Sequence, residues 1–272
     1  MLPQSDLNVL TKTSNALPMK LAINRSYQFV VLSLVIAIGL GCSTAPPPPT
    51  GGKETYVTQL NQIPIEAGLG ADQRPLIVKA VSLIKAQQLT DAGHLLDQAL
   101  ATFHGLMTSP DAKYVSAPTK AELDAFSTGS NTASNTIWVD WSFREALHLK
   151  AFIESASKRF EVALQFLDEE ATYAPTAAAP YLERGYILSQ QGKPSAALEA
   201  YTRALAQSRK YASSAGTEGA ALRGMGVVLV DLHDLYWAER YLQESLKIDP
   251  GNRVAIKELE YIRQLRAAGS TR

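Results

Sequence analysis

Small and bulky apolar residues recur at a fixed spacing in the second half of the chain. A step of 34 positions connects four pairs of them: Leu147 and Tyr181, Ala151 and Gly185, Ala163 and Ala197, and Leu167 and Tyr201. A further set keeps the same internal offsets but lies 41 positions on (226 − 185 = 41): Leu222, Gly226, Leu229, Ala238, Leu242, Ser245 and Pro250. A period of this length predicts one supersecondary unit repeated along the chain, here a pair of helices joined by a short turn.

Turn residues lie where such a unit needs them. Gly192 is in the middle turn of one copy, where a positive φ is expected, and Pro194 follows at the start of the next helix. Pro250 closes the last copy, because proline cannot continue a helix. In period and in these positions the chain resembles the tetratricopeptide repeat (TPR) family. An ordinary helical bundle with coincidental small residues is the alternative.

The resemblance implies an all-α fold, a TPR superhelical array of helix–turn–helix repeats. We assign repeats to 144–177, 178–211 and 219–252, and a degenerate repeat to 73–106, where Gln87 replaces the glycine of the turn. Residues 253–268 are expected to form a capping helix over the last repeat, because the end of an array otherwise exposes its core. We expect Val254, Ile256, Leu259, Ile262 and Leu265 to face the core, and Lys257, Glu258, Glu260 and Arg263 to face water.

Residues 107–141 interrupt the repeats and predict a strand–helix–strand insert. Residues 113–117 and 136–141 are rich in β-branched and aromatic residues, and we expect these two strands to pair. Capping boxes at Thr119-x-x-Glu122 and Ser142-x-x-Glu145 predict helices that begin just after each threonine or serine. Trp138 and Trp141 are expected either in the core of this lobe or on a contact surface.

The N-terminal 42 residues have the pattern of a signal peptide. Lys20 and Arg25 precede an apolar run that ends at Cys42, the single cysteine of the chain. Gly39-Leu40-Gly41-Cys42 resembles a bacterial lipobox, although Gly39 stands where leucine is usual. The resemblance implies lipidation of Cys42 and a periplasm-facing anchor in the cell envelope, more often at the outer than at the inner membrane. Translation from Met19 would give a signal of more usual length, and Met1 remains the alternative start. The Pro/Gly-rich residues 43–72 predict an extended tether.

Composition restricts the possible chemistry. The formal net charge is zero, so nucleic acid is not an expected partner. The four histidines have no metal-ligand spacing with one another or with Cys42, and the sequence holds no phosphate loop or dinucleotide fingerprint. We therefore assign no catalytic residue, no metal site and no cofactor.

The first helices of TPR repeats usually line a concave groove that receives a partner. The corresponding positions here are His148, Phe152, Ser155, Leu182, Tyr186, Ser189, Arg223, Val227 and Val230. Of these we expect His148, Phe152, Tyr186 and Arg223 to contact a protein or peptide, with Arg223 meeting a carboxylate. Phe152 and Tyr186 could equally be packing residues.

We therefore expect a cell-envelope binding scaffold attached to the membrane through a lipid. Three alternatives remain at this stage. The protein could be a pilotin-like assembly factor for an outer-membrane machine. It could be an enzyme with a site between the 107–141 insert and the array. It could also be a spacer without a ligand.

Overall fold

The computed structural model describes residues 66–128 and 135–269. The predicted signal peptide, Cys42, nearly all of the tether and most of the polar loop before the second strand lie outside these residues. No helix in the described ranges is long and apolar enough to cross a bilayer. The helices are α3 (Arg74–Lys85), α4 (Leu89–Leu106), α5 (Lys120–Thr128), α6 (Trp141–Ala156), α7 (Phe160–Tyr173), α8 (Ala179–Gln190), α9 (Pro194–Lys210), α10 (Glu218–Asp231), α11 (Leu235–Ile248) and α12 (Arg253–Gly269). The short elements are the strands β1 (Lys113–Ser116) and β2 (Thr136–Val139) and the 3-10 helices η2 (Ala71–Gln73) and η4 (Ala212–Thr217).

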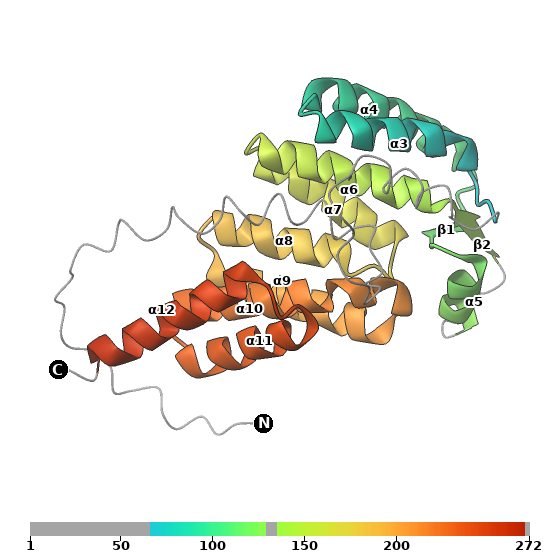
Figure 1. Ribbon diagram of the computed structural model, residues 1–272. Coiled ribbons are helices and arrows are strands. Elements are labelled where there is room, and N and C mark those ends of the chain that lie inside the picture. The colour runs from blue at the N-terminus through green and yellow to red at the C-terminus, as the bar shows by residue number, and fades with distance from the viewer. Residues whose placement is uncertain (1–65, 129–134, 270–272) are drawn as a thin grey trace, which may run out of the picture. The chain divides into compact units, whose positions relative to one another are not determined.

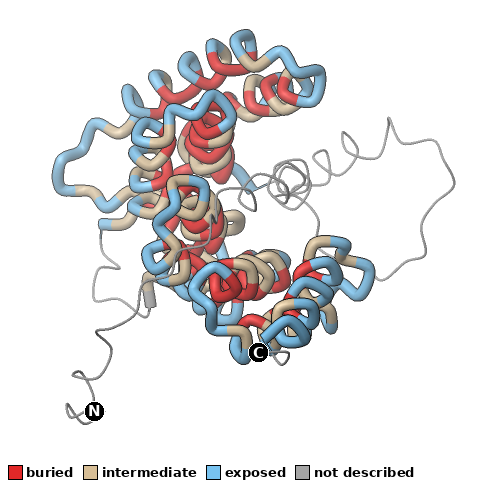
Figure 2. The backbone as a smooth tube through the Cα atoms, turned by 90° about the vertical axis from the view of Figure 1, so that its left-hand side faces the viewer, coloured by how far each residue is buried: buried red, intermediate tan, exposed pale blue. Residues whose placement is uncertain are grey.

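Four helical hairpins, α3–α4, α6–α7, α8–α9 and α10–α11, pack one after another (Figure 1). The all-α, TPR-like fold predicted from the sequence is confirmed. Each hairpin buries the side of its helices that faces the neighbouring helices and leaves its outer side exposed (Figure 2). A single hairpin cannot cover its own apolar side, so the stacking itself provides the core.

The turn inside each hairpin has the same backbone conformation. Gln87, Lys158, Gly192 and His233 all have positive φ, between 58° and 69°. They are equivalent positions, since 158 + 34 = 192 and 192 + 41 = 233. In each turn the following N–H donates to the carbonyl five residues earlier: Gln88 to Leu83, Arg159 to Glu154, Lys193 to Leu188 and Asp234 to Leu229, at 2.8–2.9 Å. These are Schellman motifs. Only the one at Gly192 could be recognised from the sequence, because only that turn contains a glycine.

The small residues lie where the paired helices approach each other. Ala151, Ala163, Ala197 and Ala238 are completely buried. A Cβ on Gly226 would lie 3.2 Å from the carbonyl oxygen of Ala238, which shows how closely α10 and α11 approach.

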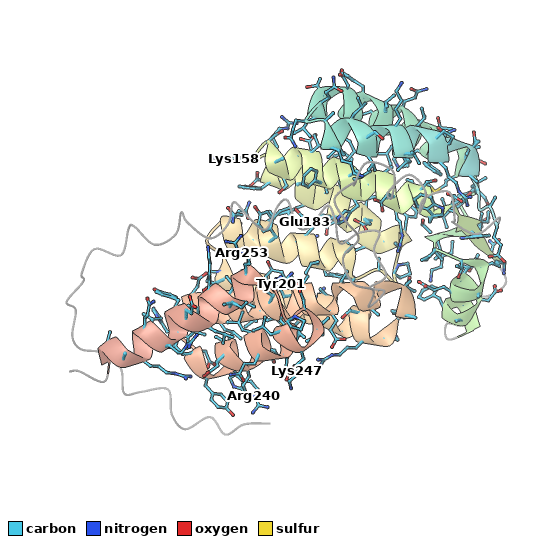
Figure 3. All side chains as sticks on the ribbon, in the orientation of Figure 1. Lys158, Glu183, Tyr201, Arg240, Lys247 and Arg253 are labelled. Carbon is cyan, nitrogen blue, oxygen red and sulfur yellow. The ribbon has the colours of Figure 1, made fainter. Side chains whose placement is uncertain are left out.

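The ring of Tyr201 occupies the space left by two glycines on different helices. A Cβ on Gly185 of α8 would come within 2.7 Å of this ring, and a Cβ on Gly224 of α10 within 2.5 Å. Figure 3 shows Tyr201 among these helices of the third and fourth hairpins. The aromatic side chain of α9 therefore joins its own hairpin to the next.

The insert forms a small two-stranded parallel sheet, and the predicted pairing of its strands is confirmed. Val115 is opposite Trp138, and Leu69 forms an isolated parallel bridge with Val139 on the other edge of β2. Trp138 packs on the cluster of Val115, Ala117 and Leu123, and its indole N–H donates to the carbonyl of Ala117 at 3.0 Å. Trp138 thus belongs to the core of the lobe.

Two predictions about the start of α6 are wrong. Trp141 is the first residue of this helix and not the end of a strand. The N-cap is Asp140, whose Oδ1 accepts from the backbone N–H of Ser142 at 3.1 Å and from its hydroxyl at 2.6 Å, so Ser142 does not act as the cap. The other predicted box is half formed, because Thr119 Oγ1 accepts from the N–H of Glu122 while the Glu122 carboxylate accepts from Thr176 Oγ1.

Asp140 also connects the first hairpin to the second. Its Oδ2 lies 2.6 Å from Nη2 of Arg74 on α3, and the Asp140 side chain is fully buried. Its backbone carbonyl accepts from the hydroxyl of Ser116 at 2.8 Å. Asp140 therefore joins α3 and α6 through its carboxylate and the sheet through its backbone carbonyl.

The capping helix α12 covers the last hairpin by packing on α11 and α10. Its predicted faces need two corrections. Glu258 is 9% exposed and Ala255 is completely buried, whereas Ile256 is 38% exposed. The buried face of α12 thus follows Ala255, Glu258 and Ile262, a spacing of three and four residues.

Candidate functional site

A row of half-buried apolar side chains follows the first helices of the four hairpins. Val81, Phe152, Tyr186 and Val227 occupy one position of the repeat, since 152 + 34 = 186 and 186 + 41 = 227. All four have intermediate exposure, and α3 contacts α6, α6 contacts α8 and α8 contacts α10. We call Val81, Phe152, Tyr186 and Val227 the first-helix row. Phe152 packs against the core of the first two hairpins and Tyr186 against the cluster around Ala151 and Leu167.

His148 lies one helical turn before Phe152 on α6, but it is only 3% exposed. Its Nδ1 is 2.9 Å from Oε2 of Glu170 on α7, and both side chains are buried. Burial alone would lower the pKa of His148. The neighbouring Glu170, which is both charged and hydrogen-bonded to the ring, outweighs this and raises that pKa to about 9, with further contributions from Glu145 and Glu183. His148 therefore carries a positive charge at neutral pH and is buried inside the array.

Glu170 replaces a small core residue. The equivalent positions in the other hairpins are Ala99, Ala204 and Ser245, all completely buried (170 − 71 = 99, 170 + 34 = 204, 204 + 41 = 245). A carboxylate at this position is tolerated only with a charged partner, because an isolated buried charge is very costly. The second hairpin thus has a buried ion pair at a position where the other hairpins have a small side chain.

Two more carboxyl groups complete this cluster. Burial raises the pKa of Glu183 on α8 to about 7, with Glu170 acting in the same direction and His148 and a hydrogen bond from Ser155 opposing. Burial also raises the pKa of Glu145 on α6. Glu183 is 2% exposed, and its Oε2 has no hydrogen-bond partner among the described residues. We call Glu145, His148, Ser155, Glu170 and Glu183 the acidic cluster. Figure 3 labels Glu183 on α8.

The acidic cluster lies on the same side of the helices as the first-helix row. On α6, spacings of three and four residues separate Glu145, His148 and Phe152. On α8, a spacing of three separates Glu183 and Tyr186. Each set therefore follows one face of its helix. Glu145 has intermediate exposure, which places one end of the cluster at the surface. A polypeptide lying on Phe152 and Tyr186 would therefore pass beside buried carboxyl groups.

Arg223 occupies the position on α10 that His148 occupies on α6 (148 + 34 + 41 = 223). Burial lowers its pKa, against the effect of Asp249. Its Nη1 donates to the carbonyl of Gly219 at 3.3 Å and lies 3.4 Å from Oγ of Ser245. Arg223 is half-buried, and its guanidinium takes part in these internal contacts.

The sequence analysis considered an active site between the array and the 107–141 insert. Glu145, His148 and Glu183, whose pKa values are raised, instead converge among α6, α7 and α8 inside the array. In the described ranges no group of three or more His, Cys, Asp or Glu side chains could hold a metal ion. The cluster was missed by sequence reasoning, although an acidic residue at the small position of the second helix, Glu170, was a readable signal.

A second feature that the sequence analysis missed is an exposed aromatic group on α11. Tyr236 is 57% exposed and Trp237 is 46% exposed, with their rings 5.3 Å apart. The guanidinium of Arg240 lies 5.5 Å from the Trp237 ring, and Figure 3 shows Arg240 at the outer side of α11. This group lies on a second helix and is therefore separate from the first-helix row.

Comparison with known proteins adds one likeness. The chain matches no protein-family model and no curated protein sequence. Among solved structures, a similar one is the first TPR domain of Spaghetti (RPAP3) bound to the HSP90 peptide SRMEEVD. The identity is 20% and the TM-score 0.41, over 46% of this chain and 93% of that domain.

Proposed function

We propose that this protein is a non-enzymatic scaffold whose first-helix row binds an extended segment of a partner polypeptide. The observation that carries the proposal is the row itself. One half-buried apolar or aromatic side chain appears at the same place on each of four adjacent helices. Packing of the hairpins does not require this exposure on the first three of these helices, because Ile77, His148 and Leu182, one turn earlier, are buried. On the fourth helix the equivalent residue, Arg223, is half-buried. Half-exposed aromatic side chains on a rigid frame provide contact area for a partner at little cost in side-chain entropy.

Site-specific photocrosslinking tests this proposal. The photoreactive residue p-benzoylphenylalanine replaces Phe152 or Tyr186 in the full-length chain, and cells are irradiated. Adducts with another polypeptide are expected from both positions. The matched control replaces Tyr261 of α12, which is 40% exposed but lies away from the row. Equal labelling from all three positions, or no adduct from Phe152 and Tyr186, would contradict the proposal.

We further propose that the scaffold is held at the bacterial cell envelope by lipid on Cys42. The tether would be the part of 43–72 that precedes Gly68, because Leu69 pairs with Val139 and Ala71–Gln73 form η2. Support comes from the sequence alone, from the basic and apolar segments that precede a single cysteine. Mass spectrometry of the mature protein is expected to find a diacylglyceryl group on an N-terminal Cys42. An uncleaved chain with an unmodified thiol would contradict this part of the proposal without affecting the binding row.

A further inference from the structure

The acidic cluster contains more negative groups than positive ones. His148 pairs with Glu170, and this pair accounts for the one imidazole. Glu145 and Glu183 are left without an ion pair in the part of the chain that the structure describes, although Glu183 accepts a hydrogen bond from Ser155. Arg144 and His148 both favour the charged form of Glu145, so Glu183 is the carboxyl group of the cluster whose surroundings leave an oxygen without a partner.

One carboxyl oxygen of the cluster is buried without a partner. Glu183 Oε2 is buried without a hydrogen-bond partner in the described ranges. Leaving a buried acceptor unsatisfied costs about 1–3 kcal/mol, so native structures seldom keep one without a reason. The side chain is 2% exposed, and the other groups that face it are His148 and Ser155 of α6 and Glu170 of α7.

The surroundings fit a long basic side chain. Phe152 lies one turn after His148 on α6, and Tyr186 lies one turn after Glu183 on α8. The aliphatic stem of a lysine or arginine could lie along these two rings while its charged end reaches the carboxylates. Charge-assisted hydrogen bonds to a carboxylate are about twice as strong as neutral ones.

From this geometry we infer that the acidic cluster receives a lysine or arginine side chain of the polypeptide bound on the first-helix row. The inference rests on the proposed function and specifies the partner as a segment with a basic residue inside its bound part. Entry is at Glu145, the member of the cluster with intermediate exposure. The cation would satisfy Glu183 Oε2, which has no hydrogen-bond partner among the described residues.

A positional-scanning decapeptide array tests the inference. Each residue type is fixed in turn at each position, and the full-length chain is applied at pH 7.5. We expect Lys and Arg to be enriched at one position at least fivefold over Gln and Glu. E183Q should abolish this enrichment while still binding peptides. The control is E199Q, which removes a carboxylate from an exposed ion pair with Arg203 on α9 and should keep the enrichment.

Proton release gives a second readout. Binding of a selected basic peptide should ionise Glu183, so calorimetry at pH 7 in buffers of different ionisation enthalpy should show net release of protons by the wild type. E183Q should show less release, and a purely structural role for Glu183 would leave the two proteins alike. Binding without any preference for a basic residue would overturn the inference but leave the proposed function standing. An array that captures no peptide would contradict both.

Discussion

Glu170 shows how far a single residue can depart from the repeat that contains it. Equivalent second-helix positions hold Ala99, Ala204 and Ser245, so a charge has replaced a small residue at one layer of the core only. Continuum arguments and mutational data agree that buried ion pairs seldom add stability over apolar packing. We therefore interpret the cluster as a feature kept for recognition and not for folding.

The titration of the cluster predicts a pH dependence of stability. The pKa of His148 is raised to about 9, so its pairing stabilises the fold below the unfolded-state value of 6.5 and this contribution is lost as the pH rises through 9. The pKa of Glu183 is raised to about 7, so its ionisation destabilises the fold progressively above 4.5. Both effects have the same sign. The free energy of unfolding, measured with urea, is expected to fall between pH 5 and pH 9.

The E183Q variant isolates one part of this dependence. Each unit of pKa shift corresponds to about 1.4 kcal/mol, so the loss between pH 5 and pH 9 should be smaller in E183Q by about 2–3 kcal/mol. E199Q, at the surface of α9, should follow the wild-type profile. A wild-type free energy that rises over this range would contradict the assigned shifts.

Gly224→Ala is expected to destabilise the protein by about 1–3 kcal/mol. The new methyl group would meet the ring of Tyr201 at 2.5 Å, and that ring is also confined by Gly185. The control is Gly105→Ala on α4, where a Cβ meets nothing within 4 Å. Gly105→Ala should be neutral or stabilise by up to about 1 kcal/mol through helix propensity. Thermal unfolding of the two variants compares them, and equal midpoints would exclude the proposed packing.

The turns between paired helices allow a prediction at the scale of the element. Lys158 and His233 have φ of 58° and 62° at the position where Gly192 has 69°. The left-handed region costs a residue with a Cβ about 1 kcal/mol. Lys158→Gly and His233→Gly are each expected to raise the midpoint of thermal unfolding. Lys193→Gly, at a residue with φ −108°, should not raise it. A lower midpoint for both turn variants would contradict the assignment of equivalent turns.

Asp140 is the residue on which the contact between the insert and the first two hairpins most depends. Asp140→Ala removes the cap of α6 and leaves Arg74 without its carboxylate, which should cost about 3–5 kcal/mol. Asp124→Ala, which removes an exposed ion pair with Lys120, should cost less than about 1 kcal/mol. Urea denaturation measures both, and a similar small loss in the two variants would show that Asp140 is not a central contact.

The sequence was sufficient for the elements that repeat or alternate. The spacing of Ala163, Ala197 and Ala238 predicted stacked hairpins, and the alternation before Asp140 predicted a strand. It was not sufficient for contacts between positions far apart in the chain. Arg74 and Asp140 are 66 residues apart, so their ion pair has no local signal. The cap by Asp140 did have one, since aspartate is a favoured N-cap residue, but the capping-box pattern at Ser142 was preferred.

The site was predictable to a similar extent. Repeat offsets placed Phe152 and Tyr186 on one row because equivalent positions lie alike in every hairpin. The same offsets grouped His148 with them as a contact residue, but His148 is buried on Glu170. Its surroundings depend on carboxyl groups from α7 and α8 that belong to other positions of the repeat, so the position of His148 alone could not reveal them.

At the scale of the whole array, the account separates two roles. The second helices, the turns and the insert hold the hairpins in register, with Tyr201 and Asp140 as their most constrained side chains. The first helices present the row, and the second and third hairpins place an ionic cluster beside it. This division predicts that changes on the row reduce binding. Truncation of Phe152 or Tyr186 also removes packing against the core and should lower stability in part.

The most direct test is the affinity of a decapeptide selected by the wild-type chain, measured by fluorescence anisotropy for two double variants. Phe152→Ala with Tyr186→Ala is expected to weaken binding at least tenfold, since each aromatic contact is worth about 1 kcal/mol or more. Tyr236→Ala with Tyr261→Ala removes two aromatic side chains that are 57% and 40% exposed away from the row, and should change the affinity less than twofold. Equal affinities of the wild type and the Phe152/Tyr186 variant would contradict binding on the first-helix row.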